Sequence, residues 1–494
     1  MTAPKALTDD QRIALLSDLK TLRTDDDDAV VQSPKWFLPL DAHARALRPE
    51  TLVVRGGRGA GKSALFHFLG HLQRDPSLAK TMSDRGMPED TQIWCDGFGS
   101  GTEHPPLEVV GAFDRTATDD DQRRFFWFAW LCVRLSLATG ASLPDGPGRA
   151  MCDGQSPKNL AQNVSQDPQL LAEVGRKDLV ALSTWMDGVE RSLANAVVIT
   201  YDRLDRIGST SGTRQQMTAS LLAMWLSLAD RYRRIRPKVF VREDLFQASL
   251  ARFPDASKLD ARSVSLEWRV EDLYRVLIKH MANTSDLLKS WIESSSRGIP
   301  LTSRGALGWV PPGTLPETGP ASQKHFVDHL AGEMMGSGPK KGHTYRWIPN
   351  RLQDAHARAV PRSFLGLVRN AAAFAVDRGP SAQYLRLLTP VELAGALENT
   401  SRLRAKEIEE EFPVVARLEN LRDKIVMLSR KAAVEALSKP LAKDDEHGTD
   451  GELVLHTLID LGVMSERSDG KIDVPDIYRY GFGILRKGGV KRPR

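Results

Sequence analysis

The sequence has few cysteines, little net charge and no long apolar segment. Its three cysteines, Cys95, Cys132 and Cys152, show no CxxC spacing and are expected to be ordinary thiols in a reducing compartment. No apolar run approaches the ~20 residues that a membrane span needs. The first residues, MTAPKALTDDQR, lack the apolar core of a signal peptide. A net charge of +5 over 494 residues does not by itself indicate nucleic acid. These absences predict a cytoplasmic protein with no membrane partner.

What the sequence does contain is a phosphate-binding motif. Residues 52–63 read LVVRGGRGAGKS, an apolar run followed by Gly56, four residues, and then Gly61, Lys62 and Ser63. Glycines allow the tight turn that points successive backbone N–H groups at phosphate oxygens. Lys62 is expected to reach the β- and γ-phosphates, and Ser63 to ligate Mg²⁺. The alternative is a glycine turn that binds no nucleotide. The expected nucleotide contacts are Gly56, Arg58, Gly59, Ala60, Gly61, Lys62, Ser63 and Ala64.

Short apolar runs alternate with helical patterns between about 35 and 268. Strand candidates are 52–54, 92–96, 196–200, 238–242 and 263–266, and helix candidates are 41–47, 121–138, 176–194 and 213–235. Pro237 is expected to end the last of these helices before the next strand. The alternation predicts an α/β fold with a parallel-sheet P-loop core over 35–268 and a loop insertion at 140–166. The aromatic helix 121–138 is expected to pack against the sheet rather than to bind a ligand.

The segments on either side of this core have helical spacing. Residues 1–34 are expected to form a helical extension, with a helix at 9–23 that places Ile13, Leu15, Leu16 and Leu19 on one side. Residues 269–400 predict a helical lid, interrupted by a loop insertion at 294–323. Residues 401–450 predict a long charged helix or helix pair, reaching 438, and a linker. Within the lid, helices are expected at 270–282, 284–293, 324–335, 349–358, 361–376 and 390–399.

Three side chains are candidates for catalysis. Asp202 follows the strand 196–200, where an acidic residue would hold Mg²⁺ together with Ser63. Asp205 is a candidate general base, or else a surface partner of Arg206. Arg242 ends the next strand, where its charge could stabilise the transition state at the γ-phosphate. The alternatives are that Asp202 only caps the following turn and that Arg242 pairs with Glu243 or Asp244.

Three arginines of the helical region are further candidates. Arg362 follows Pro361 at a predicted helix start, and proline suits the first turn of a helix. From such a lid an arginine can reach back to the γ-phosphate, so that the lid angle reports the nucleotide state. The alternative is an ordinary exposed arginine. Arg351 and Arg346 are weaker candidates for contacts to a second subunit.

These motifs together resemble the ASCE class of P-loop ATPases, and within it the bacterial STAND and KAP-type NTPases and their AAA+ and ORC-like relatives. The matching features are the P-loop, Tyr201-Asp202-Arg203-Leu204-Asp205 after an apolar strand, the strand ending in Arg242, and Pro361-Arg362. The resemblance implies ATP as the nucleotide and a molecular switch that self-associates, often in phage defence or signalling. Arg203 stands where AAA+ proteins usually have glutamate. No effector domain is evident, so an effector would be a separate protein.

The segment 451–494 resembles the winged-helix module of such ATPases. The resemblance rests on Leu461-Gly462-Val463-Met464, the turn at 468–471 and the stretch 472–480. Such a module binds DNA in some proteins and packs as an internal regulator in others. The basic tail from Arg486 to Arg494 would favour phosphate contact.

Three functions therefore remain open. The first is a hydrolysing ATPase switch that controls a partner effector, for example in antiviral defence. The second is an ORC-like ATPase that clamps or loads on DNA. The third is a scaffold that holds nucleotide without hydrolysing it.

Overall fold

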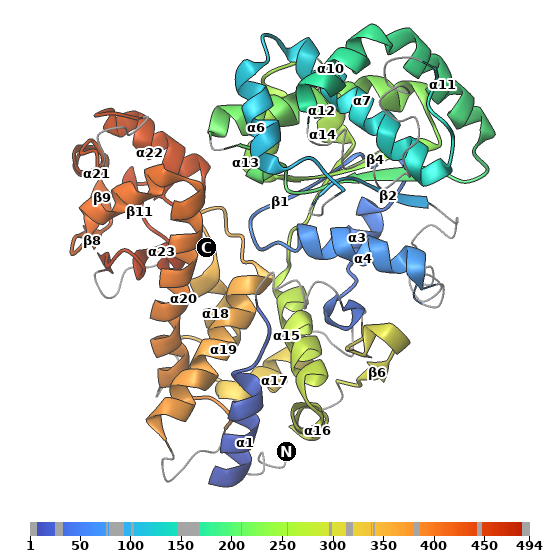
Figure 1. The fold of residues 1–494 in the computed structure, drawn as a ribbon. Helices are drawn as coiled ribbons and strands as arrows, with labels where there is room; N and C mark the ends of the chain where they lie inside the picture. The colour runs from blue at the N-terminus through green and yellow to red at the C-terminus, as the bar shows by residue number, and fades with distance from the viewer. Residues whose placement is uncertain are drawn as a thin grey trace. The chain divides into compact units, whose positions relative to one another are not determined.

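The computed structural model describes residues 7–24, 33–75, 78, 93–99, 103–145, 167–208, 210–253, 255–295, 299–312, 320–336, 338, 341–379, 386–441 and 447–486. The chain divides into two compact units (Figure 1). One unit is Val31–Glu267, and the other combines Met1–Val30 with Trp268–Arg494. Most of the expected 140–166 insertion, Cys152 and the tail beyond Arg486 lie outside the described residues. Among the described residues, no helix is both long enough and apolar enough to cross a membrane.

The Val31–Glu267 unit is built on a five-stranded sheet in the order β2-β3-β4-β1-β5, in which every pair is parallel. The strands are β1 (Val53–Gly56), β2 (Ile93–Phe98), β3 (Val197–Tyr201), β4 (Ile235–Arg242) and β5 (Ser263–Ser265). All five residues of β3 are buried, as its β-branched run predicts for a central strand. The predicted α/β class with a parallel sheet is thus confirmed.

Helices cover both faces of this sheet. In Figure 1, α3 and α4 lie on one side, and α6, α7, α10 and α12 lie on the other. The aromatic stripe of α7 is buried as expected, with Phe126, Trp127 and Trp130 fully enclosed. The helices of this unit are η1 (Pro34–Trp36), α3 (Asp41–Ala46), α4 (Lys62–Arg74), α6 (Leu107–Thr116), α7 (Asp120–Thr139), α10 (Pro168–Lys177), α11 (Leu179–Ser192), η2 (Leu204–Arg206), α12 (Ser211–Arg231), α13 (Glu243–Leu250) and α14 (Ser257–Ala261).

Two expectations for this unit were wrong. The helix expected at 176–194 is two helices, α10 and α11, which meet at Asp178. Pro237 does not separate α12 from the strand but lies inside β4. The Val239 N–H donates to Leu52 O, next to β1. Because backbone N–H groups two residues apart in a strand point the same way, the nitrogen of Pro237 also faces β1. Pairing with β1 begins only opposite Val239, and the missing proline N–H therefore breaks no ladder bond.

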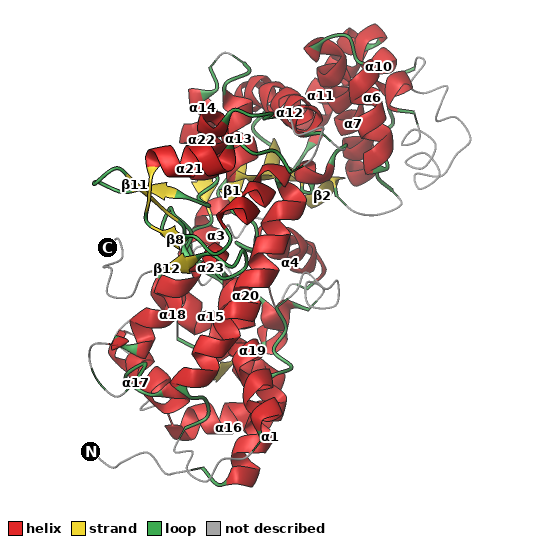
Figure 2. Ribbon diagram, turned by 90° about the vertical axis from the view of Figure 1, so that its left-hand side faces the viewer, coloured by secondary structure: helices red, strands yellow, loops and turns green. Residues whose placement is uncertain are grey.

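The second unit is mostly helical, with only short strands (Figure 2). Helix α1 (Asp9–Leu19) packs against α15, α16 and α19 of the same unit. Leu15, Leu16 and Leu19 are buried there, whereas Ile13 is 40% exposed and does not share their face. The other main helices are α15 (Val270–Thr284), α16 (Asp286–Ser295), α17 (Pro320–Ala331), α18 (Thr344–Leu352), α19 (Pro361–Arg378) and α20 (Pro390–Glu411). Helix α18 thus lies several residues before the expected 349–358.

Two segments of this unit differ from the expectation: the loop over 294–323 contains two short strands, and the long helix over 401–438 is interrupted. Within 294–323 lie the antiparallel strands β6 (Thr302–Ser303) and β7 (Trp309–Val310), with η3 (Gly305–Leu307) between them. The long charged helix expected over 401–438 is not continuous, and the alternative of a helix pair is nearer to the structure: α20 ends at Glu411, and Pro413 starts η5 (Pro413–Leu421) because proline cannot continue the helix. Then follow β8 (Ile425–Val426), β9 (Leu428–Ser429) and α21 (Arg430–Leu437).

The last part of the chain completes two small sheets. Helix α22 (Gly451–Asp460) precedes the hairpin of β10 (Ser465–Glu466) and β11 (Lys471–Asp473), and β11 also pairs with β9. After α23 (Asp476–Arg479), β12 (Leu485–Arg486) pairs in parallel with β8. Strands β8 and β9, which precede residue 451 in the chain, thus pair with strands of the 451–494 segment.

Candidate nucleotide site

The P-loop connects β1 directly to α4. Gly59 and Gly61 have φ angles of 79° and 94°, in the left-handed region where a side chain is strained. Gly61 precedes the first turn of α4, so the free N–H groups and the positive end of the helix dipole are directed into the loop. Lys62 Nζ donates to the carbonyl oxygens of Gly56 and Gly57 at 2.9 and 3.1 Å. The lysine ammonium thus lies folded back over its own loop.

Asp202 lies beside the P-loop at the carboxyl end of β3. Its backbone N–H donates to Phe98 O at 2.8 Å, and its side chain is hydrogen-bonded to the Ser63 hydroxyl and the Arg203 backbone. The residue is only 4% exposed, and its Oδ2 atom is buried without a hydrogen-bond partner. Burial raises the pKa of Asp202. A hydroxyl and a carboxylate with an unsatisfied oxygen are suitable hard ligands for Mg²⁺, so these two residues fit the ion expected here.

Lys62 lies within the field of the same acidic groups. Loss of hydration lowers the pKa of Lys62, while the charges of Asp205 and Asp202 oppose that effect. A lysine that is poorly hydrated and near carboxylates gains from a polyphosphate that brings new negative oxygens. The geometry therefore suits the role expected of Lys62.

Asp205 and Arg242 face one another across the carboxyl ends of β3 and β4. Arg242 Nη1 lies 3.8 Å from Asp205 Oδ2, and the guanidinium also makes two hydrogen bonds to Asp244, at 3.1 and 2.8 Å. The pairing with Asp244 that the sequence left open is therefore present. It is compatible with a role at phosphate, because it holds the guanidinium in one orientation.

The turn between Asp202 and Asp205 has an unusual backbone. Arg203 adopts φ 60° and precedes η2, so a non-glycine residue occupies the left-handed region next to the site. After η2, Gly208 lies so close to α6 that a Cβ on Gly111 would come within 2.4 Å of Gly208 Cα. This contact fixes the segment that carries Asp205 against a helix.

Two of the three candidate arginines of the helical unit, Arg362 and Arg351, have intramolecular partners. Arg362 Nη1 donates to Glu407 at 3.3 Å, and Arg346 is exposed on α18. Arg351 donates to Asp476 at 2.7 Å, and the Asp476 side chain is only 2% exposed. A role for Arg351 in contacts to another subunit would require breaking this buried ion pair.

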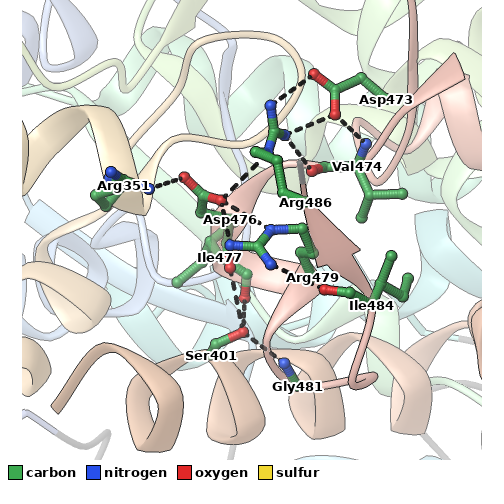
Figure 3. A network of polar contacts seen from close by, with 10 residues as sticks. All are labelled: Arg351, Ser401, Asp473, Val474, Asp476, Ile477, Arg479, Gly481, Ile484 and Arg486. Carbon is green, nitrogen blue, oxygen red and sulfur yellow. Dashed lines mark hydrogen bonds and ion pairs between the residues drawn. The ribbon is translucent and has the colours of Figure 1, made fainter. Parts of the chain in front are cut away.

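A buried ion network fixes the C-terminal module to its own helices (Figure 3). Asp476 faces Arg351, Arg479 and Arg486, and Arg486 also donates to Asp473 at 2.6 Å. The Ser401 hydroxyl on α20 donates to Ile477 O at 2.8 Å and accepts from the Gly481 N–H at the same distance. Arg486, expected to contact phosphate as the first residue of the basic tail, is instead 10% exposed and paired within the chain.

Sequence reasoning missed a polar group at the neighbouring strand β2. Asp96 accepts a hydrogen bond from the Thr200 hydroxyl at 3.1 Å and lies close enough to Asp202 for its charge to raise the pKa of Asp96, although burial is the larger cause. His104, in the segment after β2, is buried, and burial lowers its pKa to about 3. The available signal was an aspartate at the end of a predicted strand, since the strand order brings that end beside β3.

Comparison with known proteins does not identify a family. No family model and no curated protein matches the chain. Solved structures similar to it include the Aeropyrum pernix Orc1 protein in complex with DNA (14% identity, 95% of each chain, TM-score 0.31). Others are Cdc6p from Pyrobaculum aerophilum (10%, 96% of this chain and 92% of that one, 0.29) and the Aeropyrum pernix ORC2 protein in ADPNP–ADP complexes (11%, 97% and 94%, 0.34).

Proposed function

We propose that this chain is an ATP-binding and ATP-hydrolysing P-loop ATPase that works as a nucleotide-dependent switch. The observation that carries the proposal is the convergence of Lys62, Ser63, Asp202, Asp205 and Arg242 at the carboxyl edge of one parallel sheet. Ser63 lies close enough to Asp202 for its hydroxyl to lower the pKa of that carboxyl, although about 140 residues separate them in sequence. Strand β4 lies between β1 and β3 in the sheet, which is the strand order expected of the ASCE class that the sequence motifs resemble.

Each group has a role in this proposal. The loop N–H groups and Lys62 would bind the phosphates, and Ser63 and Asp202 would hold Mg²⁺, which would supply charge neutralisation of the polyphosphate. Asp205, whose side chain is 35% exposed, accepts a proton from the attacking water. Arg242 offers a positive charge to the transferring phosphoryl group and is kept in place by Asp244.

We propose DNA as the partner to test first. The module from β9 to β11 has the order strand, helix, helix, hairpin that a winged helix has, and the sequence beyond it is basic, with Lys487, Lys491, Arg492 and Arg494. The exposed face of the second helix, α22, has no lysine or arginine but bears Glu452, Leu453, His456 and Asp460. Contact with DNA would therefore be made by the tail and would be weakly dependent on base sequence.

Control of a separate effector protein, for example in antiviral defence, is the second candidate role. The ion network of Figure 3 favours it, because a C-terminal module held on α18 and α20 suits internal regulation better than groove reading. In this role ATP would change the arrangement or self-association of the chain and thereby the partner's activity.

Turnover measurements separate these proposals. Mg²⁺-dependent ATP hydrolysis is measured for the wild type, Lys62→Ala and Asp202→Ala, each with and without duplex DNA. Loss of turnover in both variants supports the ATPase. Stimulation by DNA that disappears on removal of residues 487–494 supports the DNA role, and turnover indifferent to DNA supports a protein partner. ATP binding without any turnover would favour the non-hydrolysing scaffold.

A further inference from the structure

Three potential metal ligands meet beyond the carboxyl end of β2. Asp96 belongs to the strand, and Glu103 and His104 lie in the segment that leads to α6. One ligand atom from each lies within 4.8 Å of the others. His104 Nε2 is 4.0 Å from Asp96 Oδ2 and 3.9 Å from Glu103 Oε1. Tetrahedral ligands about 2.0–2.1 Å from a Zn²⁺ ion lie roughly 3.3 Å apart, so a small closure of exposed carboxylates would complete the set.

The state of His104 indicates that this cluster is more than an acidic patch. Its side chain is 1% exposed, yet neither ring nitrogen has a hydrogen-bond partner among the described residues. The ring is held edge-to-face near Phe98 and Trp130, with centroids 6.2 and 6.1 Å away. A buried polar group without a partner is destabilising, and His104 Nε2 lies about 4 Å from a carboxylate oxygen of both Asp96 and Glu103.

We propose that Asp96, Glu103 and His104 bind one divalent transition-metal ion of the Zn²⁺ type, at a site separate from the Mg²⁺ of the P-loop. An imidazole nitrogen among the ligands favours Zn²⁺ or a similar borderline ion over Mg²⁺ or Ca²⁺, which prefer oxygen ligands. Three protein ligands leave a fourth position for water, since the carboxylates are 41% and 47% exposed to solvent. The two carboxylates would neutralise the charge of the ion, which offsets its repulsion from the nearby Arg134 guanidinium, whose Nε donates to Asp96 O.

The ion would act on the position of the segment after β2. Asp96 Oδ1 is also the acceptor for Thr200, two residues before Asp202 on β3. Binding would hold Glu103 and His104 to the strand, and through Thr200 to the edge that carries Asp202. The proposal does not rest on ATP hydrolysis, because metal binding itself is the readout.

Cobalt is the probe for this site. The full chain is stripped of metal and titrated with Co²⁺ in excess Mg²⁺, and the visible d–d absorption is followed. We expect one Co²⁺ per chain, displaced by one equivalent of Zn²⁺. Glu103→Gln should weaken Co²⁺ binding by at least about tenfold, the loss that even an indirect partner of a metal ligand causes. Glu108→Gln is the matched control, because Glu108 is exposed in the first turn of α6 and outside the cluster.

His104→Gln should abolish the absorption, with folding checked by circular dichroism. Since Glu103 is exposed, its variant keeps the test decisive even if the histidine variant does not fold. No Co²⁺ binding by the wild type overturns the proposal. Equal affinities of the Glu103→Gln and Glu108→Gln proteins overturn it as well.

Discussion

Replacement of Asp205 by asparagine tests the proposed general base. The substitution keeps the shape of the side chain and removes its ability to accept a proton. Loss of a positioned general base typically slows a reaction by about 10²–10⁴-fold. We therefore expect kcat for ATP to fall by at least about 100-fold. Asp205 lies close enough to Lys62 for its charge to raise the lysine pKa, whereas the Ser63 hydroxyl is shared with Asp202.

The effect on ATP binding should be much smaller. At 3.8 Å the attraction between Asp205 and Arg242 is about 1 kcal/mol in a water-like environment, and the 35% exposure of Asp205 places the pair near that limit. Removing the pair changes binding by about fivefold at most. Loss of a negative charge near the phosphates acts in the favourable direction. The dissociation constant for ATP, measured by calorimetry without turnover, should thus change little while kcat collapses.

Asp244→Asn is the matched control for this experiment. Both carboxylates contact Arg242, but Asp244 provides the two short hydrogen bonds that orient it. We expect this variant to lose less than about tenfold in kcat, as the base is intact. The reasoning is refuted if Asp205→Asn retains a third or more of wild-type turnover. Equal losses in both variants would assign the effect to the orientation of Arg242.

Three further predictions concern stability. Arg12→Met removes the ion-pair partner of the buried Glu392 carboxylate, so it should lower the free energy of unfolding by about 3–5 kcal/mol. The double variant Arg12→Met/Glu392→Met should recover part of that loss in urea titrations, less the Glu392 bond to the Thr389 N–H that caps α20. Burial lowers the pKa of Lys238 to about 7, so the free energy of unfolding should rise by a few kcal/mol as pH increases from about 7 to 10. Lys238→Met should remove that rise; an equal rise in both proteins would contradict the prediction. Gly111→Ala would place a Cβ 2.4 Å from neighbouring backbone and should cost about 1–3 kcal/mol and reduce turnover, whereas Gly188→Ala, with nothing within 4 Å, should stabilise its helix by up to about 1 kcal/mol.

The elements with strong local signals could be predicted from the sequence. The P-loop and the strand before Asp202 are defined by residue types at short spacing, and the structure has β1 and β3 where these patterns place them. The continuity of 401–438 could not be judged in the same way, because its charged residues suit a helix although Pro413 ends one. There η5, β8 and β9 owe their structure to packing with β11 and β12.

The partners within the site depended on strand order, which the sequence did not reveal. Arg242 contacts both Asp205 and Asp244 because β4 lies beside β3, and no local pattern distinguishes that from a pair with Asp244 alone. Asp96 and His104 were overlooked for the same reason. Each is unremarkable in its own segment, and their meeting depends on how the chain returns after β2.

The placement of α1 has a consequence for the order in which the chain folds during synthesis. Leu15, Leu16 and Leu19 are buried against α15, α16 and α19, which the ribosome makes after the entire Val31–Glu267 unit. At a synthesis rate of about 5–20 residues per second, the apolar face of α1 stays exposed for on the order of tens of seconds before α15 has been made. The Val31–Glu267 unit can fold in the meantime, because it is one continuous segment of the chain. A nascent chain whose residues up to 267 have left the ribosome, but whose later helices have not, should therefore have a folded middle and a leading segment accessible to chaperones.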